Sequence, residues 1–84
     1  ASDVLGTCLR ARDVMWIADP PPSFPLICHA KIRSRSPEAP ADVWPLPEGG
    51  VEVRFEQPQR AIAPGQAVVF YRGDEVLGGG WILR

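Results

Sequence analysis

The chain has 84 residues, enough for one small domain, with 45% hydrophobic residues, 10 prolines and a formal net charge of -1. The prolines argue against long helices, because an interior proline removes a hydrogen bond and clashes with the preceding turn. The acidic balance argues against non-specific nucleic-acid binding by the whole surface, and no apolar stretch reaches membrane-spanning length.

The first half of the chain predicts three or four strands. Residues 8–12 and 14–17 are two strands, or one strand bent at Arg12 and Asp13. A proline-rich loop over residues 19–25 leads into a strand over residues 26–35, which alternates between apolar and polar side chains. Residues 41–46 form the next candidate, and Pro45 predicts that it is an edge strand, because proline cannot donate to a ladder.

The second half predicts three more strands, over residues 51–56, 66–72 and 75–83. Pro64 and Gly65 suit a type II turn, because proline presets the negative φ and glycine accepts the positive φ that follows. Gly73 and Asp74 suit a two-residue hairpin loop. Six or seven short strands separated by turns predict an all-β barrel or sandwich, and closure into a barrel would remove exposed edges.

Alternation along residues 26–35 gives a functional hypothesis. Successive side chains of a strand point to opposite faces, so small and apolar residues share one face. The other face carries a basic row of His29, Lys31, Arg33 and Arg35. Two interpretations remain open: a solvated face balanced by Glu52 and Glu56, or a surface that contacts a phosphate backbone.

Three other side chains are weaker candidates for contact with a nucleic acid. Arg54 alternates with apolar neighbours and favours an outward ion pair, whereas Arg60 belongs to an expected loop where structural and binding roles are equally supported. Trp44, on the expected edge strand, is the best candidate for an exposed ring that stacks on a base. Trp16 and Trp81 lie in apolar runs and are expected to fill the barrel interior or cap its ends.

The glycines at positions 78–80 do not form a phosphate loop, because they continue into a strand instead of opening a helix. We expect bare backbone there to allow a sharp bend or close packing of a neighbouring chain. Cys8 and Cys28 form no metal motif, and both are expected to be buried packing thiols, with a disulfide bridge or an accessible redox thiol as the alternative. His29, the single histidine, has no acidic partners at metal-ligand spacing, so no catalytic group or metal site is predicted.

Three segments together carry a resemblance to a known family: PQRAIAPGQAVVFYRGDEVLGGGWI at residues 58–82, ARDVMWI at 11–17 and CHAKIRSR at 28–35. They closely resemble the C-terminal β-barrel domain of the bacterial-type tRNA-specific 2-thiouridylases, from about residue 8 to residue 82. The resemblance implies a small closed antiparallel barrel of six or seven strands, like the barrel domains of translation elongation factors.

The resemblance also implies a cytoplasmic parent enzyme of three domains, in which residues 1–84 follow an N-terminal PP-loop domain and a central domain. Such an enzyme uses ATP with magnesium and a sulfur-donor protein to insert sulfur into the wobble uridine of tRNA. This chain has no SGGxDS-like loop and no catalytic cysteine pair, so it is expected to be an accessory, non-catalytic domain without a cofactor. The candidate tRNA-binding residues are His29, Lys31, Arg33, Arg35, Arg60 and Trp44. The alternative is a stand-alone structural or protein-interaction barrel.

Overall fold

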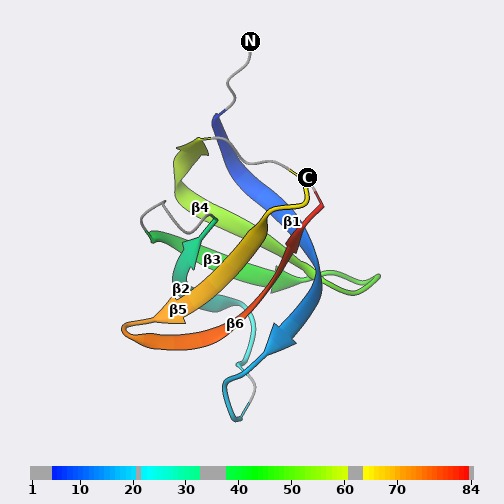
Figure 1. The fold of residues 1–84 in the computed structure, drawn as a ribbon, viewed down its shortest axis with the longest axis vertical. Coiled ribbons are helices and arrows are strands. Elements are labelled where there is room, and N and C mark those ends of the chain that lie inside the picture. Colours follow the sequence, from blue (N-terminus) through cyan, green and yellow to red (C-terminus); the bar gives the residue numbers. More distant parts are fainter. Residues whose placement is uncertain (1–4, 21, 33–37, 61–63, 84) are drawn as a thin grey trace.

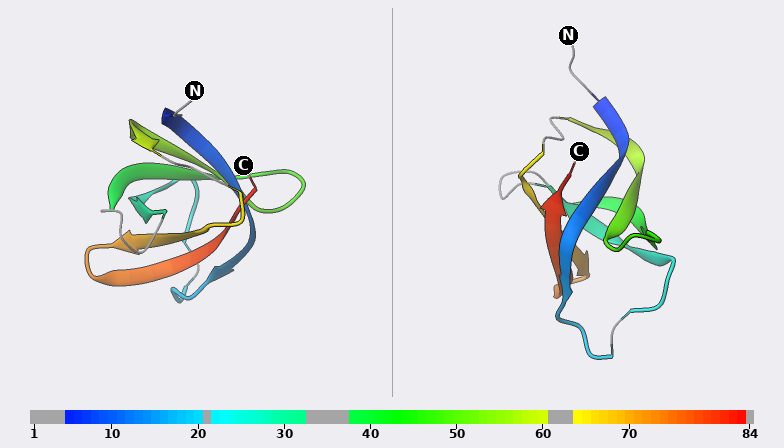
Figure 2. Two further views of the ribbon diagram at one scale, coloured as in Figure 1. Left: turned by 45° about the horizontal axis from the view of Figure 1, so that its top comes forward. Right: turned by 90° about the vertical axis from the view of Figure 1, so that its right-hand side faces the viewer.

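A computed structural model describes residues 5–20, 22–32, 38–60 and 64–83, with the backbone alone at Leu5, Gly6 and Arg60. The described residues form six antiparallel strands that close into a barrel in the order β1-β4-β3-β2-β5-β6 (Figures 1 and 2). The strands are β1 (Leu5–Trp16), β2 (Leu26–Lys31), β3 (Ala39–Pro45), β4 (Val51–Arg60), β5 (Ala67–Arg72) and β6 (Glu75–Ile82). The predicted all-β barrel is therefore confirmed, with six strands.

The two strand candidates at the start are one strand, bent where the sequence suggests a turn. Asp13 has a positive φ of 51°, and the register between β1 and β6 shifts between Arg12 and Met15. An extra residue on one strand bends it and increases its twist. This bend turns the second half of β1 along β6, which helps to close the barrel.

Alternating apolar side chains fill the interior. Burial along β2 and β3 follows the two-residue period, and the core draws on all six strands. Its largest fully buried side chains are Phe70, Leu9, Leu77, Ile82, Val43, Val53 and Val68. Because each strand has an inner and an outer face, the outer positions are available for function.

Trp16, the last residue of β1, packs against the core. Its ring stacks on Phe70 with centroids 5.4 Å apart, and Phe24, from the connection between β1 and β2, meets it edge-on at 5.7 Å. The prediction that Trp16 fills the interior or caps an end is confirmed.

The glycines of β6 make room for β1 and β5. A Cβ at Gly78 would lie 2.4 Å from the Met15 carbonyl oxygen, and one at Gly80 would lie 2.8 Å from the Arg12 carbonyl oxygen. A Cβ at Gly79 would lie 2.7 Å from the carbonyl oxygen of Val68. Close packing of neighbouring strands on bare backbone therefore accounts for this run of glycines.

Two predictions about strand ends are wrong. Strand β3 is not an edge, because it pairs with both β2 and β4; Pro45 is its last residue. Arg60 is not in a loop, because β4 extends to it and its backbone pairs with Leu5. The turns at Pro64–Gly65 and Gly73–Asp74 are confirmed, with positive φ at both glycines.

Candidate nucleic-acid interface

The first half of the predicted basic row lies on the outer face of β2. Cys28, Ala30 and Ile32 are buried, whereas His29 is exposed and Lys31 is half-buried. The predicted alternation is thus confirmed as far as the structure describes this segment. Arg33 and Arg35 lie outside the described residues, so the strand assigned to residues 26–35 is described only as far as Lys31, with a bend at Ile32.

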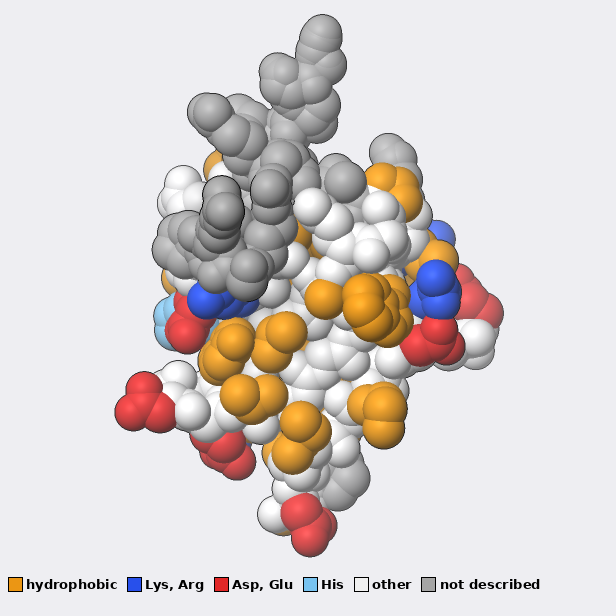
Figure 3. Space-filling model, in the orientation of Figure 1, with side chains coloured by type: hydrophobic (Ala, Val, Ile, Leu, Met, Phe, Trp, Pro, Cys, Tyr) orange, Lys and Arg blue, Asp and Glu red, His pale blue; other side chains and the backbone are white. Residues whose placement is uncertain are grey.

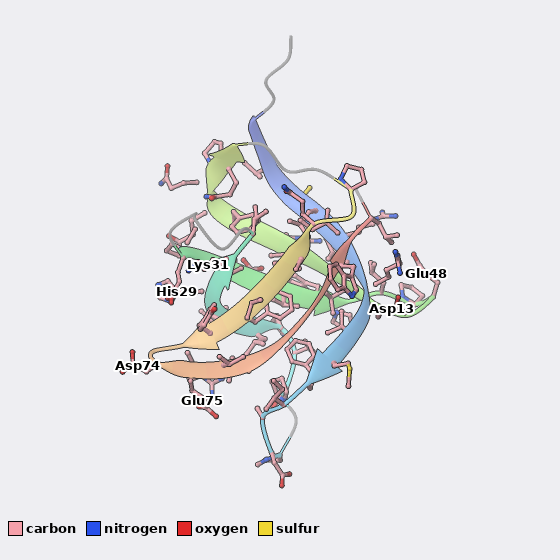
Figure 4. All side chains as sticks on the ribbon, in the orientation of Figure 1. Asp13, His29, Lys31, Glu48, Asp74 and Glu75 are labelled. Carbon is pink, nitrogen blue, oxygen red and sulfur yellow. The ribbon has the colours of Figure 1, made fainter. Side chains whose placement is uncertain are left out.

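The acidic residues expected to balance this row lie elsewhere. Glu52 and Glu56 are on β4, which is separated from β2 by β3. On β2, His29 is opposite Pro40 and Tyr71, and Lys31 is opposite Val69. Pro40, Tyr71 and Val69 carry no charge, but Glu38, directly before β3, continues this register toward Lys31, and Figure 3 shows an acidic side chain beside the histidine. In Figure 4 His29 and Lys31 lie together on the β2 side of the barrel.

Trp44 belongs to a separate polar cluster on β3 and β4. Its indole Nε1 donates a hydrogen bond to Asp42, and the Arg54 guanidinium lies over the ring, 4.8 Å from its centroid. Arg54 also pairs with Glu52 at 3.6 Å, which confirms its predicted ion-pair role. Trp44 is half-buried on a paired strand, so the expectation of an exposed edge tryptophan is wrong. A base that stacks on the covered face of Trp44 would have to displace Arg54.

The six candidate residues therefore do not form one described patch. His29 is opposite Pro40, four residues before Trp44, which separates the two by roughly 13 Å along β3. Arg60 ends β4, six residues beyond Arg54, which is opposite Asp42. The outer face of β2, defined by His29 and Lys31, is here called the β2 face.

Trp81 is on the outside of the barrel. Its side chain is 48% exposed, so the prediction that it fills or caps the interior is wrong. The error arises because the apolar run Trp81, Ile82, Leu83 conceals the alternation: Ile82 faces inward and its two neighbours face solvent. The same holds for Met15, Trp16 and Ile17, of which Met15 and Ile17 are exposed. These outward residues were missed as functional candidates.

The two cysteines differ. Cys8 is exposed, which contradicts the expectation of two buried thiols, and Cys28 is buried in the barrel interior. Burial raises the pKa of the Cys28 thiol from 9.0 to about 11, with Arg72 opposing the rise and Asp42 adding to it.

This pKa predicts a loss of stability at alkaline pH. Between pH 9 and about 11 the unfolded chain releases the Cys28 proton while the folded domain retains it, so the free energy of unfolding falls as pH rises. The contribution is at most about 1.4 kcal/mol per pH unit. Urea unfolding across this range should show a shallower decline for Cys28→Ala than for the unaltered chain; parallel pH profiles would contradict the prediction.

The described ranges offer no arrangement typical of a metal site or of a membrane helix. No group of three histidine, cysteine, aspartate or glutamate side chains there is arranged to hold a metal ion. No helix in those ranges is long and apolar enough to span a membrane.

Comparison with known proteins identifies the domain. A family model for the aminomethyltransferase β-barrel domain matches residues 6–82. The tRNA-specific 2-thiouridylase of Symbiobacterium thermophilum is 58% identical over 76 residues, which are 90% of this chain and 20% of that protein. A second 2-thiouridylase, from Geobacillus kaustophilus, is 54% identical over 76 residues, again 90% of this chain and 20% of that protein.

A relative with lower sequence identity carries the same domain. The tRNA-specific 2-thiouridylase of Chloroflexus aurantiacus is 49% identical over 79 residues, 89% of this chain and 22% of that protein. The chain thus spans about a fifth of the length of these relatives. The resemblance found in the sequence is confirmed: the chain belongs to the aminomethyltransferase β-barrel domain family, in the form carried by tRNA-specific 2-thiouridylases.

Proposed function

We propose that this chain is the C-terminal accessory domain of a three-domain, cytoplasmic tRNA 2-thiouridylase, and that it contacts tRNA while the other domains transfer sulfur to the wobble uridine. The observation that carries the proposal is the 58% identity over 90% of the chain to a tRNA-specific 2-thiouridylase. The family match over residues 6–82 reaches all six strands, so it does not rest on one local motif.

The chemistry of sulfur transfer belongs to the rest of the parent enzyme. The described residues do not fit ATP with magnesium: they include no acidic cluster for the metal, and the glycines at 78–80 lie within β6 instead of at a helix N-terminus. ATP, magnesium and a sulfur-donor protein are therefore proposed as partners of the PP-loop and central domains. The role left to this chain is to hold and position tRNA.

Contact with tRNA is proposed for the β2 face and the sequence that continues it. Lys31 is flanked on β5 by the uncharged Val69, and Arg33 and Arg35 follow in the sequence, so the cations of this segment outnumber the nearby carboxylates Glu38 and Asp42. The net charge of -1 does not oppose this, because a local group of cations releases counterions from a phosphate backbone regardless of the domain's total charge.

A salt series tests this contact. Fluorescence anisotropy should show that the domain, or the parent enzyme, binds a tRNA with a modifiable wobble uridine less tightly as salt rises. The triple variant Lys31→Glu, Arg33→Glu, Arg35→Glu should bind more weakly and lower the salt slope by about one for each phosphate group that the protein no longer neutralises.

The matched control is Arg10→Glu. Arg10 is an exposed arginine on β1, and the barrel order places β1 and β2 on opposite walls. This substitution changes charge by the same amount per site and should leave the slope nearly unaltered. If Arg10→Glu lowered the salt slope as much as the triple variant does, binding would depend on the overall charge of the domain. That result would contradict a specific tRNA contact on β2.

The alternative is a stand-alone protein-interaction barrel. The exposed Met15 and Trp81 favour some protein contact, whether or not tRNA also binds. The reading frame upstream discriminates between the two: an SGGxDS-type loop supports the accessory domain, and its absence supports the independent module.

A further inference from the structure

Large apolar side chains gather on the outside of one wall of the barrel. Figure 3 shows hydrophobic side chains concentrated over β5, β6 and the end of β1. We name this the apolar face and define it by outward residues of these three strands and the residue after β1: Met15, Ile17, Val69, Tyr71, Val76 and Trp81. Met15 is 75% exposed and Ile17 is 69% exposed. Exposed apolar side chains gathered on one wall favour an interaction site there.

A shallow groove crosses the apolar face where β6 has no side chain. Gly79 lies between Met15 of β1 and Val69 of β5 in the strand register. With Trp81 these residues line a hollow of about 230 Å³ whose floor is glycine backbone. The groove therefore offers apolar walls to a side chain inserted from a partner.

Charged side chains of both signs surround the apolar face. Asp74 and Glu75 at the β5–β6 turn and Asp13 at the bend of β1 lie at opposite margins of the face in Figure 4. Arg12 is close to Trp81 in the register, but its guanidinium is paired with Asp13. At the other margin the exposed Arg72 is opposite Glu75 in the register, so the apolar centre has a rim of mixed charge, which suits a protein surface better than a phosphate backbone.

The opposite wall has a different character. In the closed barrel β3 lies opposite β6, and its outer side chains include Asp42 and Trp44, which are joined by a hydrogen bond. The apolar face adjoins the β2 face, because Val69 of β5 is opposite Lys31 of β2 in the strand register. The barrel thus presents a protein-like contact surface and a basic surface side by side.

We propose that the apolar face is the surface on which this domain packs against the remaining polypeptide of its parent enzyme. This rests on the proposed function, because that polypeptide is the other four fifths of a 2-thiouridylase, which the relatives carry beyond this domain. Within one chain that polypeptide is present at high effective concentration, so a modest apolar interface is enough to fix the domain. Docking on this wall leaves the β2 face open to tRNA.

Site-specific thiol labelling tests the proposal. Met15→Cys is compared in the 84-residue chain and in the parent enzyme, both carrying Cys8→Ser to remove the exposed thiol, with labelling at each site quantified by peptide mass spectrometry. Ile27→Cys is the matched control, because Ile27 is 72% exposed but lies on β2. We expect labelling at position 15 to be at least tenfold slower in the parent than in the 84-residue chain, and labelling at position 27 to be similar in both.

Three results would overturn the proposal. Equal labelling of position 15 in both proteins would show that the parent leaves the face open. Protection that requires added tRNA would assign the face to nucleic acid, and protection of the 84-residue chain that grows with its concentration would assign it to a second copy. Formation of 2-thiouridine is measured in the same parent preparations to separate the two proposals. An active parent with an open apolar face contradicts only the docking proposal. An inactive parent with a protected apolar face contradicts only the proposed function.

Discussion

Replacement of Gly78 with valine is expected to lower the free energy of unfolding by about 3 kcal/mol or more, at or above the upper end of typical overpacking costs. Even a Cβ at this position would lie 2.4 Å from the Met15 carbonyl oxygen and 2.7 Å from Cε3 of Trp16. The first obstacle is backbone of the paired strand β1, which cannot rotate away as a flexible side chain can. Relief requires β1 and β6 to separate, which breaks the barrel closure.

Urea unfolding followed by circular dichroism measures this loss. Glu75→Val is the control, because it introduces the same side chain on the same strand at an exposed position and should stay within about 0.5 kcal/mol of the unaltered domain. If Gly78→Val unfolds at the same urea concentration as Glu75→Val, the close approach of β1 to β6 is not the reason for the glycine.

Truncation of Phe70 to alanine is expected to cost about 3 to 5 kcal/mol, the usual range for a buried phenylalanine. Phe70 is 0% exposed and stacks on Trp16, so its removal leaves a cavity beneath the Trp16 ring. A domain of this size has a total stability of roughly 4 to 13 kcal/mol. The loss is therefore a large fraction of the total stability, and the variant should unfold at a clearly lower temperature than the unaltered domain.

Phe24→Ala provides the comparison, because Phe24 contacts the same tryptophan from outside the barrel and is 38% exposed. Its loss should cost about 1 kcal/mol, mainly the edge-on aromatic contact. Thermal unfolding of the two variants side by side gives the ranking. Similar melting temperatures would mean that Trp16 is held from outside and not from the core.

The strand pattern was predictable where turn residues and alternation coincide. Gly65 and Gly73 take the positive φ that their turns require, and residues 26–32 alternate as expected. The bend in β1 was left open, because the choice between a turn and a bulge depends on pairing with β6 and not on the local sequence. Pro45 was misread as an edge marker because a proline at the last position of a strand has the same local signature.

Exposure of single side chains was harder to predict. Continuous apolar runs around Trp16 and Trp81 give no indication of which residue faces inward, so the apolar face was missed. The position of Trp44 depends on Asp42 and on Arg54 of another strand, a contact set by register. Cys8 is exposed because its outward position on β1 is fixed by barrel closure, which composition does not reveal.

Two adjoining walls of the barrel differ in the side chains that they expose. The β2 face carries His29 and Lys31, and the apolar face carries large exposed hydrophobic side chains such as Met15 and Trp81. In the proposed parent enzyme the first surface meets tRNA and the second meets protein. Because the two surfaces adjoin at Val69 and Lys31, docking of the domain would also set the position of the tRNA contact relative to the catalytic domain.

The most direct test is formation of 2-thiouridine in tRNA by the parent enzyme, measured against tRNA concentration with ATP, magnesium and a sulfur donor supplied. We expect the parent to be active, the triple variant Lys31→Glu, Arg33→Glu, Arg35→Glu to raise the KM for tRNA about tenfold, or about 1.4 kcal/mol in binding, and Arg10→Glu to leave it unaltered. A parent that forms no 2-thiouridine would contradict the assigned role, and an active parent whose KM is the same in all three proteins would show that this domain does not contact tRNA through β2.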